Sequence, residues 1–149
     1  MDLPGLLEKT HLFHGVAADD LQAVAQVAAP VSLAVGEAVY DSGSAADALY
    51  LMEIGTVEMR VRGGEQVLAT YGSGQVFGEV PFFGRSAERT RVSRAVAREH
   101  CSLLRIAYAD LERLLSARPP LAAAVYRNAC LFVTQALREL MPHMKRPYF

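Results

Sequence analysis

The chain has 149 residues, which is enough for one domain with a hydrophobic core. Hydrophobic residues make up 52% of it, which excludes a chain that is disordered throughout. The formal net charge of −1 excludes a protein that binds polyanions through overall positive charge and leaves room only for a local basic site. Thirteen of the fifteen basic residues are arginines, whose guanidinium groups bind oxyanions through paired hydrogen bonds. The position of the arginines is therefore the first functional question.

The first 30 residues predict helices, because leucine, phenylalanine, valine and alanine recur there at spacings of three and four. Asp19 or Asp20 is expected to begin the second helix, and Pro30 is expected to end it. His11 and His14 would share a helix face, but no third metal ligand accompanies them in the sequence. Capping or surface roles are therefore favoured for both histidines.

Residues 31–107 change to the pattern of β-structure, in which nine glycines separate short runs of β-favouring residues. The Gly63-Gly64 pair is typical of a hairpin turn. Many short strands with glycine turns favour a closed or covered sheet. The predicted fold class is therefore mainly β with flanking helices (α+β), a β-roll or jelly roll of about eight strands. The clearest strand candidates are residues 49–54, 56–61, 66–71, 92–97 and 102–107.

Residues 108–140 return to helical spacing. A short helix begins at Tyr108 and ends at Pro119-Pro120, and a long helix follows from Leu121 to about Leu140. The long helix is apolar on more than one face, so it packs either against the roll and a second chain or on one side only. We expect a frayed tail over 141–149 and a single domain over 1–149. The main apolar stripe is Ala122, Val125, Ala129, Phe132, Ala136 and Leu140, and Leu121, Leu131, Val133 and Leu137 lie outside it.

The sequence favours a location in the cytoplasm. No apolar run reaches the roughly 20 residues that a membrane-spanning helix needs. The N-terminus has Asp2 and lacks the basic stretch of a secretory signal. Cys101 and Cys130 are too few for a disulfide framework and have apolar neighbours in the sequence, so we expect two reduced thiols in the core.

Residues 76–95 combine the residue types that bind a small charged ligand. Glu79 follows a predicted strand and a glycine turn, and Arg89 stands ten positions later, at the entry to the next strand. The carboxylate accepts hydrogen bonds from a hydroxyl, and the guanidinium binds a phosphate. Backbone N–H groups at the start of the short apolar turn after Glu79 would add to an anion site. An ordinary surface ion pair remains the alternative at this spacing.

Several short motifs occur in order along the chain: Gly36-Glu37, Tyr40, Gly43, Ala46-Asp47, Leu49-Tyr50, Gly55, Phe77-Gly78-Glu79 and Arg89-Thr90. Together with the order helix, roll and helix pair, these motifs resemble the cyclic nucleotide-binding domain family. That family includes bacterial cAMP receptor proteins, kinase regulatory subunits and nucleotide-gated channels. The resemblance covers about residues 10–140, nearly the whole chain.

The resemblance implies a role for each matching residue. Glu79 would bind the ribose 2′-hydroxyl, and Gly78 would let the backbone approach the sugar. Arg89 would pair with the cyclic phosphate, and Thr90 would add a hydroxyl and an N–H. The long C-terminal helix would be the lid over the site and the dimer contact. The other ligand-binding candidates are Phe77 and Val80, the base-facing Leu68 and Ala69, and Phe132, Thr134, Gln135 and Ala136 on the lid.

The chain departs from the family pattern in three ways. Pro81 stands where nucleotide-binding members usually have alanine or glycine, and proline has no N–H to donate to a phosphate. A phosphate oxygen left unpaired would cost about 1–3 kcal/mol of binding free energy. Arg91 replaces a small residue, and it either adds positive charge to the phosphate site or points to solvent. Ala136 and Leu137 align with a base-contacting Thr-Ser pair of the cAMP receptor, and the nearest polar residues are Thr134 and Gln135.

Five arginines fall within fourteen residues of this part of the chain. Because side chains alternate along a strand, we expect these arginines to point to water. Arg89 is the exception, because its spacing from Phe77-Gly78-Glu79 assigns it to the ligand. The five are Arg85, Arg89, Arg91, Arg94 and Arg98.

These observations predict a non-catalytic regulatory module that binds a cyclic mononucleotide, cAMP or cGMP, and relays binding through the C-terminal helix. The alternative is a scaffold of the same fold that no longer binds nucleotide and serves as an interaction or dimerisation module. The sequence contains no catalytic constellation and no His-x-His metal motif, so we expect neither an enzyme nor a metal or other cofactor. The expected partners are a cyclic mononucleotide, a second copy of the chain and an effector protein. DNA and membrane are not expected as partners, since no helix-turn-helix follows residue 140.

Overall fold

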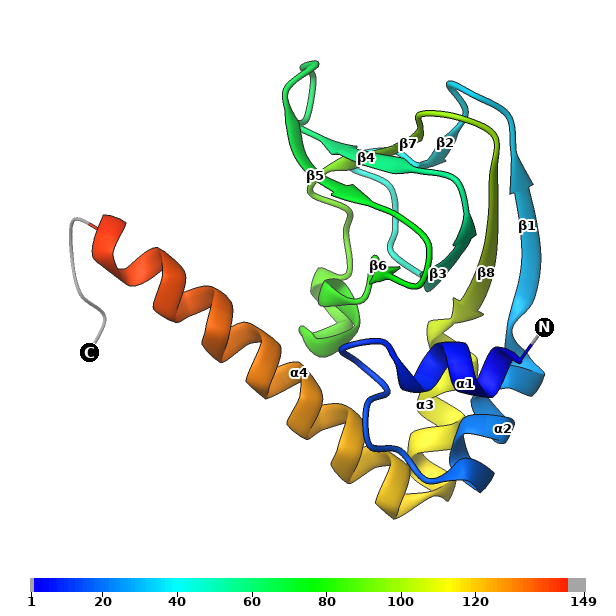
Figure 1. The fold of residues 1–149 in the computed structure, drawn as a ribbon. Coiled ribbons are helices and arrows are strands. Elements are labelled where there is room, and N and C mark those ends of the chain that lie inside the picture. Colours follow the sequence, from blue (N-terminus) through cyan, green and yellow to red (C-terminus); the bar gives the residue numbers. More distant parts are fainter. Residues whose placement is uncertain (1, 145–149) are drawn as a thin grey trace.

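The computed structural model describes residues 2–144. Its helices are α1 (Leu3–Glu8), α2 (Ala18–Val27), α3 (Tyr108–Ala117) and α4 (Pro119–Leu140). Its strands are β1 (Ala29–Leu33), β2 (Ala38–Tyr40), β3 (Ala48–Ile54), β4 (Val57–Arg60), β5 (Val67–Tyr71), β6 (Val76–Phe77), β7 (Arg94–Ala97) and β8 (Cys101–Ala107). The strands form two four-stranded antiparallel sheets, β1-β8-β3-β6 and β2-β7-β4-β5, and α1, α2 and α3 gather at one end of the roll (Figure 1). This arrangement confirms the predicted fold class.

Strand β3 joins the two hydrophobic cores of the molecule. Its first five residues are all buried, because both faces of the strand are covered. Tyr50 and Met52 belong to the core inside the roll. Leu49 and Leu51, which point the opposite way, belong to the core between the first sheet and the helices. The roll and its helices are therefore held together by one uninterrupted apolar run of the sequence.

The N-terminal segment differs from the prediction where the helices end. Helix α2 ends at Val27, and Pro30 lies inside strand β1 instead of ending a helix. β1 is an edge strand that pairs only with β8, so a residue without a backbone N–H is tolerated there. Asp19 and Asp20 lie in the first turn of α2, where carboxylates interact favourably with the helix dipole, but the N-cap residue is Ala17.

The five strand candidates of the sequence form strands β3, β4, β5, β7 and β8, and the short strands β1, β2 and β6 complete the set of eight. The β7 strand begins at Arg94, two residues later than predicted. The Gly63-Gly64 turn connects the antiparallel pair β4 and β5. Gly63 has a φ of +70°, a conformation that glycine adopts without strain.

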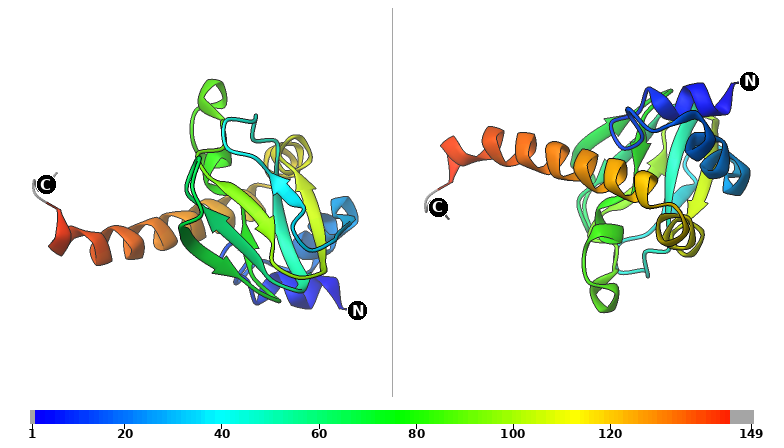
Figure 2. Two further views of the ribbon diagram at one scale, coloured as in Figure 1. Left: turned by 90° about the horizontal axis from the view of Figure 1, so that it is seen from above. Right: turned by 90° about the horizontal axis from the view of Figure 1, so that it is seen from below.

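Helix α4 divides into two halves. In the first half, Leu121 and Val125 are fully buried in the core between the roll and the helices. In the second half, the helix extends away from the body of the molecule (Figures 1 and 2), and Leu131, Phe132 and Val133 are each at least 45% exposed. The predicted apolar stripe is therefore a core face only in the first half. The expected frayed tail begins instead with a 3-10 turn over Met141–His143, and residues 145–149 lie outside the described part of the chain.

The two cysteines have different environments. Cys101 is buried in the roll, as predicted. Cys130 is exposed, so the prediction of a core thiol is wrong for this residue. The reason is its position on α4, where the helix leaves the core.

Candidate functional site

A cavity of about 740 Å³ lies where the segment 78–93, strand β5, the N-terminal loop 9–11 and helix α4 approach one another. This volume falls in the range of small-molecule sites, about 300–1,000 Å³. Glu79, 7% exposed, contributes a carboxylate to its wall. Seven of the predicted ligand-binding residues line the cavity: Leu68, Ala69, Gly78, Glu79, Val80, Thr90 and Phe132.

Gly78 shapes the wall of this cavity. Its φ of +80° is a backbone conformation that residues with side chains rarely adopt, and an added Cβ would meet Arg91 Nη1 at 3.1 Å. The carbonyl of Gly78 accepts hydrogen bonds from the Arg91 guanidinium at 2.9 Å and from the Tyr108 hydroxyl. Glycine at this position therefore lets the chain turn tightly and lets the arginine pack against the turn.

Arg91 is a buried part of the cavity wall, although strand alternation placed it toward water. It is 4% exposed, and its guanidinium lies 3.9 Å from the ring centroid of Tyr40. Besides the carbonyl of Gly78, it donates to the carbonyl of Ala48. The alternation prediction fails here because Arg91 precedes β7 and lies in an irregular segment, where the period of two does not apply.

Arg89 lies outside the cavity wall. Its Nη2 is 2.7 Å from Glu112 Oε1 on α3 and also donates to the carbonyl of Phe82 at 2.9 Å. Thr90, the next residue, lines the cavity. The ion pair that the sequence left open for Arg89 therefore forms, but with Glu112 and not with Glu79.

Glu79 contacts a residue that the resemblance did not indicate. His11 Nε2 lies 3.1 Å from Glu79 Oε1, and the His11 ring stacks on Phe132 with a centroid distance of 4.4 Å. His11 is in the loop after α1, and Phe132 is on α4. One imidazole thus connects the carboxylate of the cavity wall to the helix that the resemblance makes the lid.

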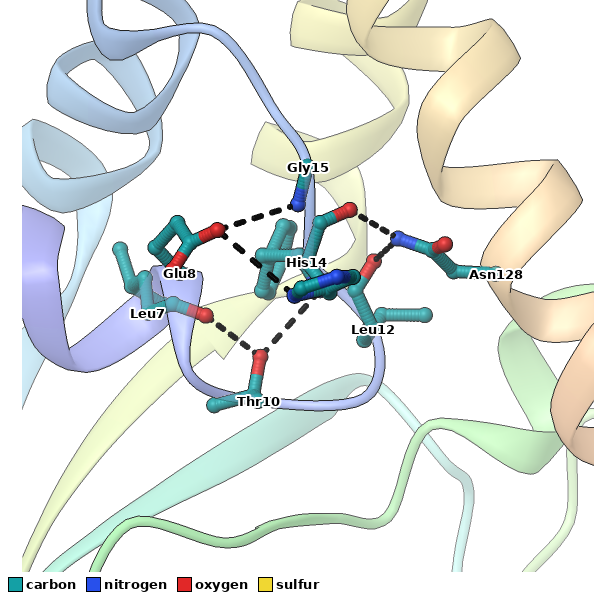
Figure 3. Close-up of polar contacts among 8 residues, drawn as sticks. Leu7, Glu8, Thr10, Leu12, His14, Gly15 and Asn128 are labelled. Carbon is teal, nitrogen blue, oxygen red and sulfur yellow. Dashed lines mark hydrogen bonds and ion pairs between the residues drawn. The ribbon is translucent and has the colours of Figure 1, made fainter.

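Asn128 fixes the loop that carries His11. Its Nδ2 donates to the carbonyls of Leu12 at 2.9 Å and His14 at 2.8 Å, so the loop is bonded to α4 across more than 110 residues of sequence (Figure 3). On the α1 side, the hydroxyl of Thr10 donates to the carbonyl of Leu7 and accepts from the N–H of Phe13. These bonds place His11 between the roll and α4. His11 and His14 both lie in the turn between α1 and α2, so the expectation that they share a helix face is wrong.

Two tyrosine rings lie near the Arg91 guanidinium, that of Tyr40 at 3.9 Å and that of Tyr108 at 5.9 Å. Burial raises the pKa of Tyr108 to about 12, partly opposed by the positive charge of Arg91. Burial also raises the pKa values of Tyr40 and Tyr71. The hydroxyl groups are therefore protonated at neutral pH, and that of Tyr108 is a hydrogen-bond donor to Gly78.

The remaining predicted site residues lie away from this cavity. Phe77 is 1% exposed and packs inside the roll between Tyr50 and Tyr71. Thr134 lines a second cavity of about 550 Å³, between α4 and the turn after Glu79. Gln135 donates to Glu139 on the surface of α4, and Ala136 lines neither cavity.

Sequence reasoning missed three kinds of residue at this site: the loop residues Lys9 and His11, the aromatic residues Tyr40 and Tyr71, and Met59. The period of two along β4 and β5 carried a signal for Met59 and Tyr71, because residues two apart share a face of a strand. No local pattern indicated His11, since its position depends on a hydrogen bond to α4.

Within residues 2–144, no group of three or more His, Cys, Asp or Glu side chains is arranged to hold a metal ion. In the same part of the chain, no helix is long and apolar enough to cross a membrane. The polar side chains of the described cavity wall include Glu79, His11, Thr90 and Arg91, together with Lys9, Gln75, Glu88 and Ser93.

The family model of the cyclic nucleotide-binding domain matches residues 30–118, and the chain belongs to this family. Domains of this family are regulatory modules. The match includes Gly78, Glu79, Arg89 and Arg91. A comparison with curated proteins finds no significant match.

Solved structures of regulatory proteins share the fold. The sensor domain of the transcriptional regulator DNR from Pseudomonas aeruginosa is 24% identical, with a TM-score of 0.76 over 97% of this chain and 95% of that one. The Thermus thermophilus catabolite activator protein is 30% identical, with a TM-score of 0.71 over 87% of this chain and 59% of that one. The regulatory domain of Toxoplasma gondii PKA, solved with cAMP, is 19% identical, with a TM-score of 0.68 over 75% of this chain and 42% of that one.

Proposed function

We propose that this chain is a non-catalytic sensor module of the cytoplasm that binds a cyclic mononucleotide, cAMP or cGMP, in the cavity of about 740 Å³. The observation that carries the proposal is the Gly78-Glu79 pair of the family motif on the wall of this cavity. Glu79 would accept hydrogen bonds from the ribose 2′-hydroxyl, and Thr90 would donate to the phosphate. Leu68, Ala69 and Phe132 supply apolar surface for the base.

The proposed response runs through His11 and helix α4. A ribose hydroxyl at Glu79 competes with His11 for the same carboxylate oxygen, and His11 stacks on Phe132 of α4. Ligand binding would therefore change the balance between arrangements of α4, because the ligand interacts differently with each of them. An effector protein, or a second copy of the chain, would read the position of the helix.

Isothermal titration calorimetry with cAMP, cGMP and linear 5′-AMP tests the proposal. We expect binding of one cyclic nucleotide and at least tenfold weaker binding of 5′-AMP. At a ligand concentration of 100 Kd, the free energy of unfolding should rise by about 2.7 kcal/mol, which is visible as a higher melting temperature. No heat of binding and no thermal shift at millimolar cAMP or cGMP would overturn it.

A scaffold that binds no nucleotide is the second candidate. Pro81 lines the cavity without a backbone N–H, and Arg89 is paired with Glu112. The exposed apolar residues on the second half of α4 fit an interaction surface. The calorimetric result separates this candidate from the sensor.

Both candidates include a homodimer through the second half of α4, since Leu131 and Val133 are 55% and 59% exposed. Sedimentation measures this association directly. Leu131→Glu should weaken the dimer at least tenfold, because the charge would be desolvated in an apolar interface. Ala123→Glu, at an exposed position of the first half, is the matched control and should leave the dimer unchanged. A monomer at all concentrations, or equal effects of the two variants, would contradict this interface.

A further inference from the structure

Among the described residues, Arg91 is the arginine that lines the cavity, it is 4% exposed, and its guanidinium has no carboxylate partner. No Asp or Glu oxygen of residues 2–144 lies within ion-pairing distance of it. Its hydrogen-bond acceptors are two backbone carbonyls, those of Gly78 and Ala48. Its Nε is buried and makes no hydrogen bond in the described part of the chain, which is also true of Arg89 Nε, so the missing carboxylate partner is what sets Arg91 apart.

Carbonyl groups and an aromatic ring stabilise this charge but do not neutralise it. Tyr40 lies under the guanidinium at 3.9 Å, and Tyr108 lies 5.9 Å away. A buried charge without a counter-charge is unfavourable, because it has lost the solvation of water. Glu79, an acidic residue of the same wall, is in contact with His11 instead. The wall therefore favours an anion in the cavity beside Arg91.

Arg89 differs from Arg91 in its charge pairing and in its position relative to the cavity. Its charge is compensated by Glu112 at 2.7 Å, and its guanidinium is not part of the cavity wall. To reach an anion in the cavity, Arg89 would first have to leave the carboxylate of Glu112. The resemblance to the family assigns the phosphate to this arginine, but the contacts within this chain do not favour that assignment.

We propose that Arg91, and not Arg89, supplies the positive charge that binds the anionic group of the ligand. The inference rests on the proposed function, under which this group is the cyclic phosphate. Arg91 keeps its bonds to Gly78 and Ala48 and acts through its charge, which is strong in a wall of low polarity. Arg91 is bonded to the carbonyl of Gly78, the residue before Glu79. The same part of the wall would therefore bind the ribose hydroxyl through Glu79 and the phosphate through Arg91.

Two matched variants, Arg91→Gln and Arg89→Gln, test the inference. Glutamine removes the charge but keeps an amide donor, so a carbonyl of Gly78 or Ala48 can stay bonded. The probes are the cyclic nucleotide that binds more tightly and its uncharged nucleoside, titrated at two salt concentrations. Arg91→Gln should weaken cyclic nucleotide binding at least tenfold, reduce its salt dependence and change nucleoside binding by less than about twofold. Arg89→Gln should change both affinities by less than about threefold.

The outcomes separate the inference from the proposed function. Loss of cyclic nucleotide binding in Arg89→Gln, or full binding by Arg91→Gln, overturns the inference and leaves the function intact. Absence of cyclic nucleotide binding by the unaltered chain overturns the function and the inference with it. Circular dichroism reports folding; if Arg91→Gln does not fold, Arg91→Lys keeps the charge and should bind within about tenfold of the unaltered chain. If Arg89→Gln then weakens cyclic nucleotide binding more than Arg91→Lys does, the inference is again overturned.

Discussion

The two walls of the cavity are built differently. On the roll side, Gly78, Glu79 and Arg91 are held by hydrogen bonds to one another's backbone or to neighbouring groups, and Glu79 and Arg91 are less than 10% exposed. On the helix side, Phe132 is 45% exposed and is held by stacking on His11. α4 itself is anchored only in its first half (Figure 1).

This difference separates two tasks that one ligand site has to perform. A buried, bonded wall is preorganised, so it binds a ligand without a large loss of conformational entropy. A half-exposed wall with few contacts shifts at low cost, so it can respond to the ligand. Substitutions on the roll side should therefore change stability and affinity strongly, and substitutions on the helix side should change them weakly.

The largest effect is expected for Phe77→Ala on the roll side. Phe77 is 1% exposed and packs against Tyr50 and Tyr71, so its truncation leaves a cavity and should lower the free energy of unfolding by about 3–5 kcal/mol. Phe132→Ala removes the same side chain from the helix side and should cost less than about 1 kcal/mol. Urea denaturation measures both values, and equal losses would contradict the difference between the packed interior of the roll and the second half of α4.

The next effect concerns affinity. Glu79→Gln keeps the size of the side chain but removes the charge that strengthens a hydrogen bond to a ribose hydroxyl, so cyclic nucleotide binding should weaken by about 1.5–3 kcal/mol. Glu88→Gln changes an exposed carboxylate that lines the same cavity and is the matched control, with an expected effect under about 0.5 kcal/mol. Calorimetric titration gives both values. A larger loss of affinity for Glu88→Gln than for Glu79→Gln would indicate that the ribose hydroxyl binds at Glu88 and not at Glu79.

A smaller change in affinity is expected on the helix side. Phe132→Ala removes an aromatic surface of the cavity and the partner of the His11 ring, so affinity should fall by about 0.5–1.5 kcal/mol. Phe132→Leu, which keeps apolar area, should lose less. If Phe132→Ala abolishes binding altogether, α4 is a fixed part of the site and not a responsive one.

The smallest effect appears in the dependence of stability on pH. Burial raises the pKa of Tyr108 to about 12 and raises those of Tyr40 and Tyr71, so the folded state holds these protons more tightly than the unfolded state, where a tyrosine has a pKa of 10.0. Their contribution to stability is complete below pH 10 and is lost as the pH rises above it. Tyr108→Phe should make the fall in unfolding free energy between pH 9 and 11 less steep, as followed by urea denaturation. An unchanged slope would contradict a buried Tyr108 hydroxyl bonded to the carbonyl of Gly78.

The order of helices and strands could be predicted from the sequence, because hydrophobic period and glycine turns are local signals. The strands β3 and β8 and the helices α3 and α4 lie within a few residues of their predicted bounds. The prediction for Pro30 was wrong, because a proline can either end a helix or lie in an edge strand. Only the order of strands in the sheet shows that Pro30 lies in an edge strand. Gly78 and Glu79 were predicted at the site because their motif is contiguous.

Other features of the site depend on residues far apart in the sequence. His11 reaches Glu79 because Asn128 binds its loop, and Arg89 is drawn to Glu112 on α3, 23 positions later. Arg89 and Arg91 are only two positions apart, and on a regular strand both would face the same way. The segment before β7 is irregular, so their side chains reach different neighbours.

The sequence by itself determined a β-roll with flanking helices, the turn at Gly78 and a carboxylate beside it, because these follow from local periodicity and backbone sterics. Only the tertiary structure decided which arginine is buried at the cavity, which side chain contacts the carboxylate of Glu79 and where α4 leaves the core. The physical reason is that burial and charge pairing are sums over neighbours brought together by folding, and no spacing along the chain encodes those neighbours.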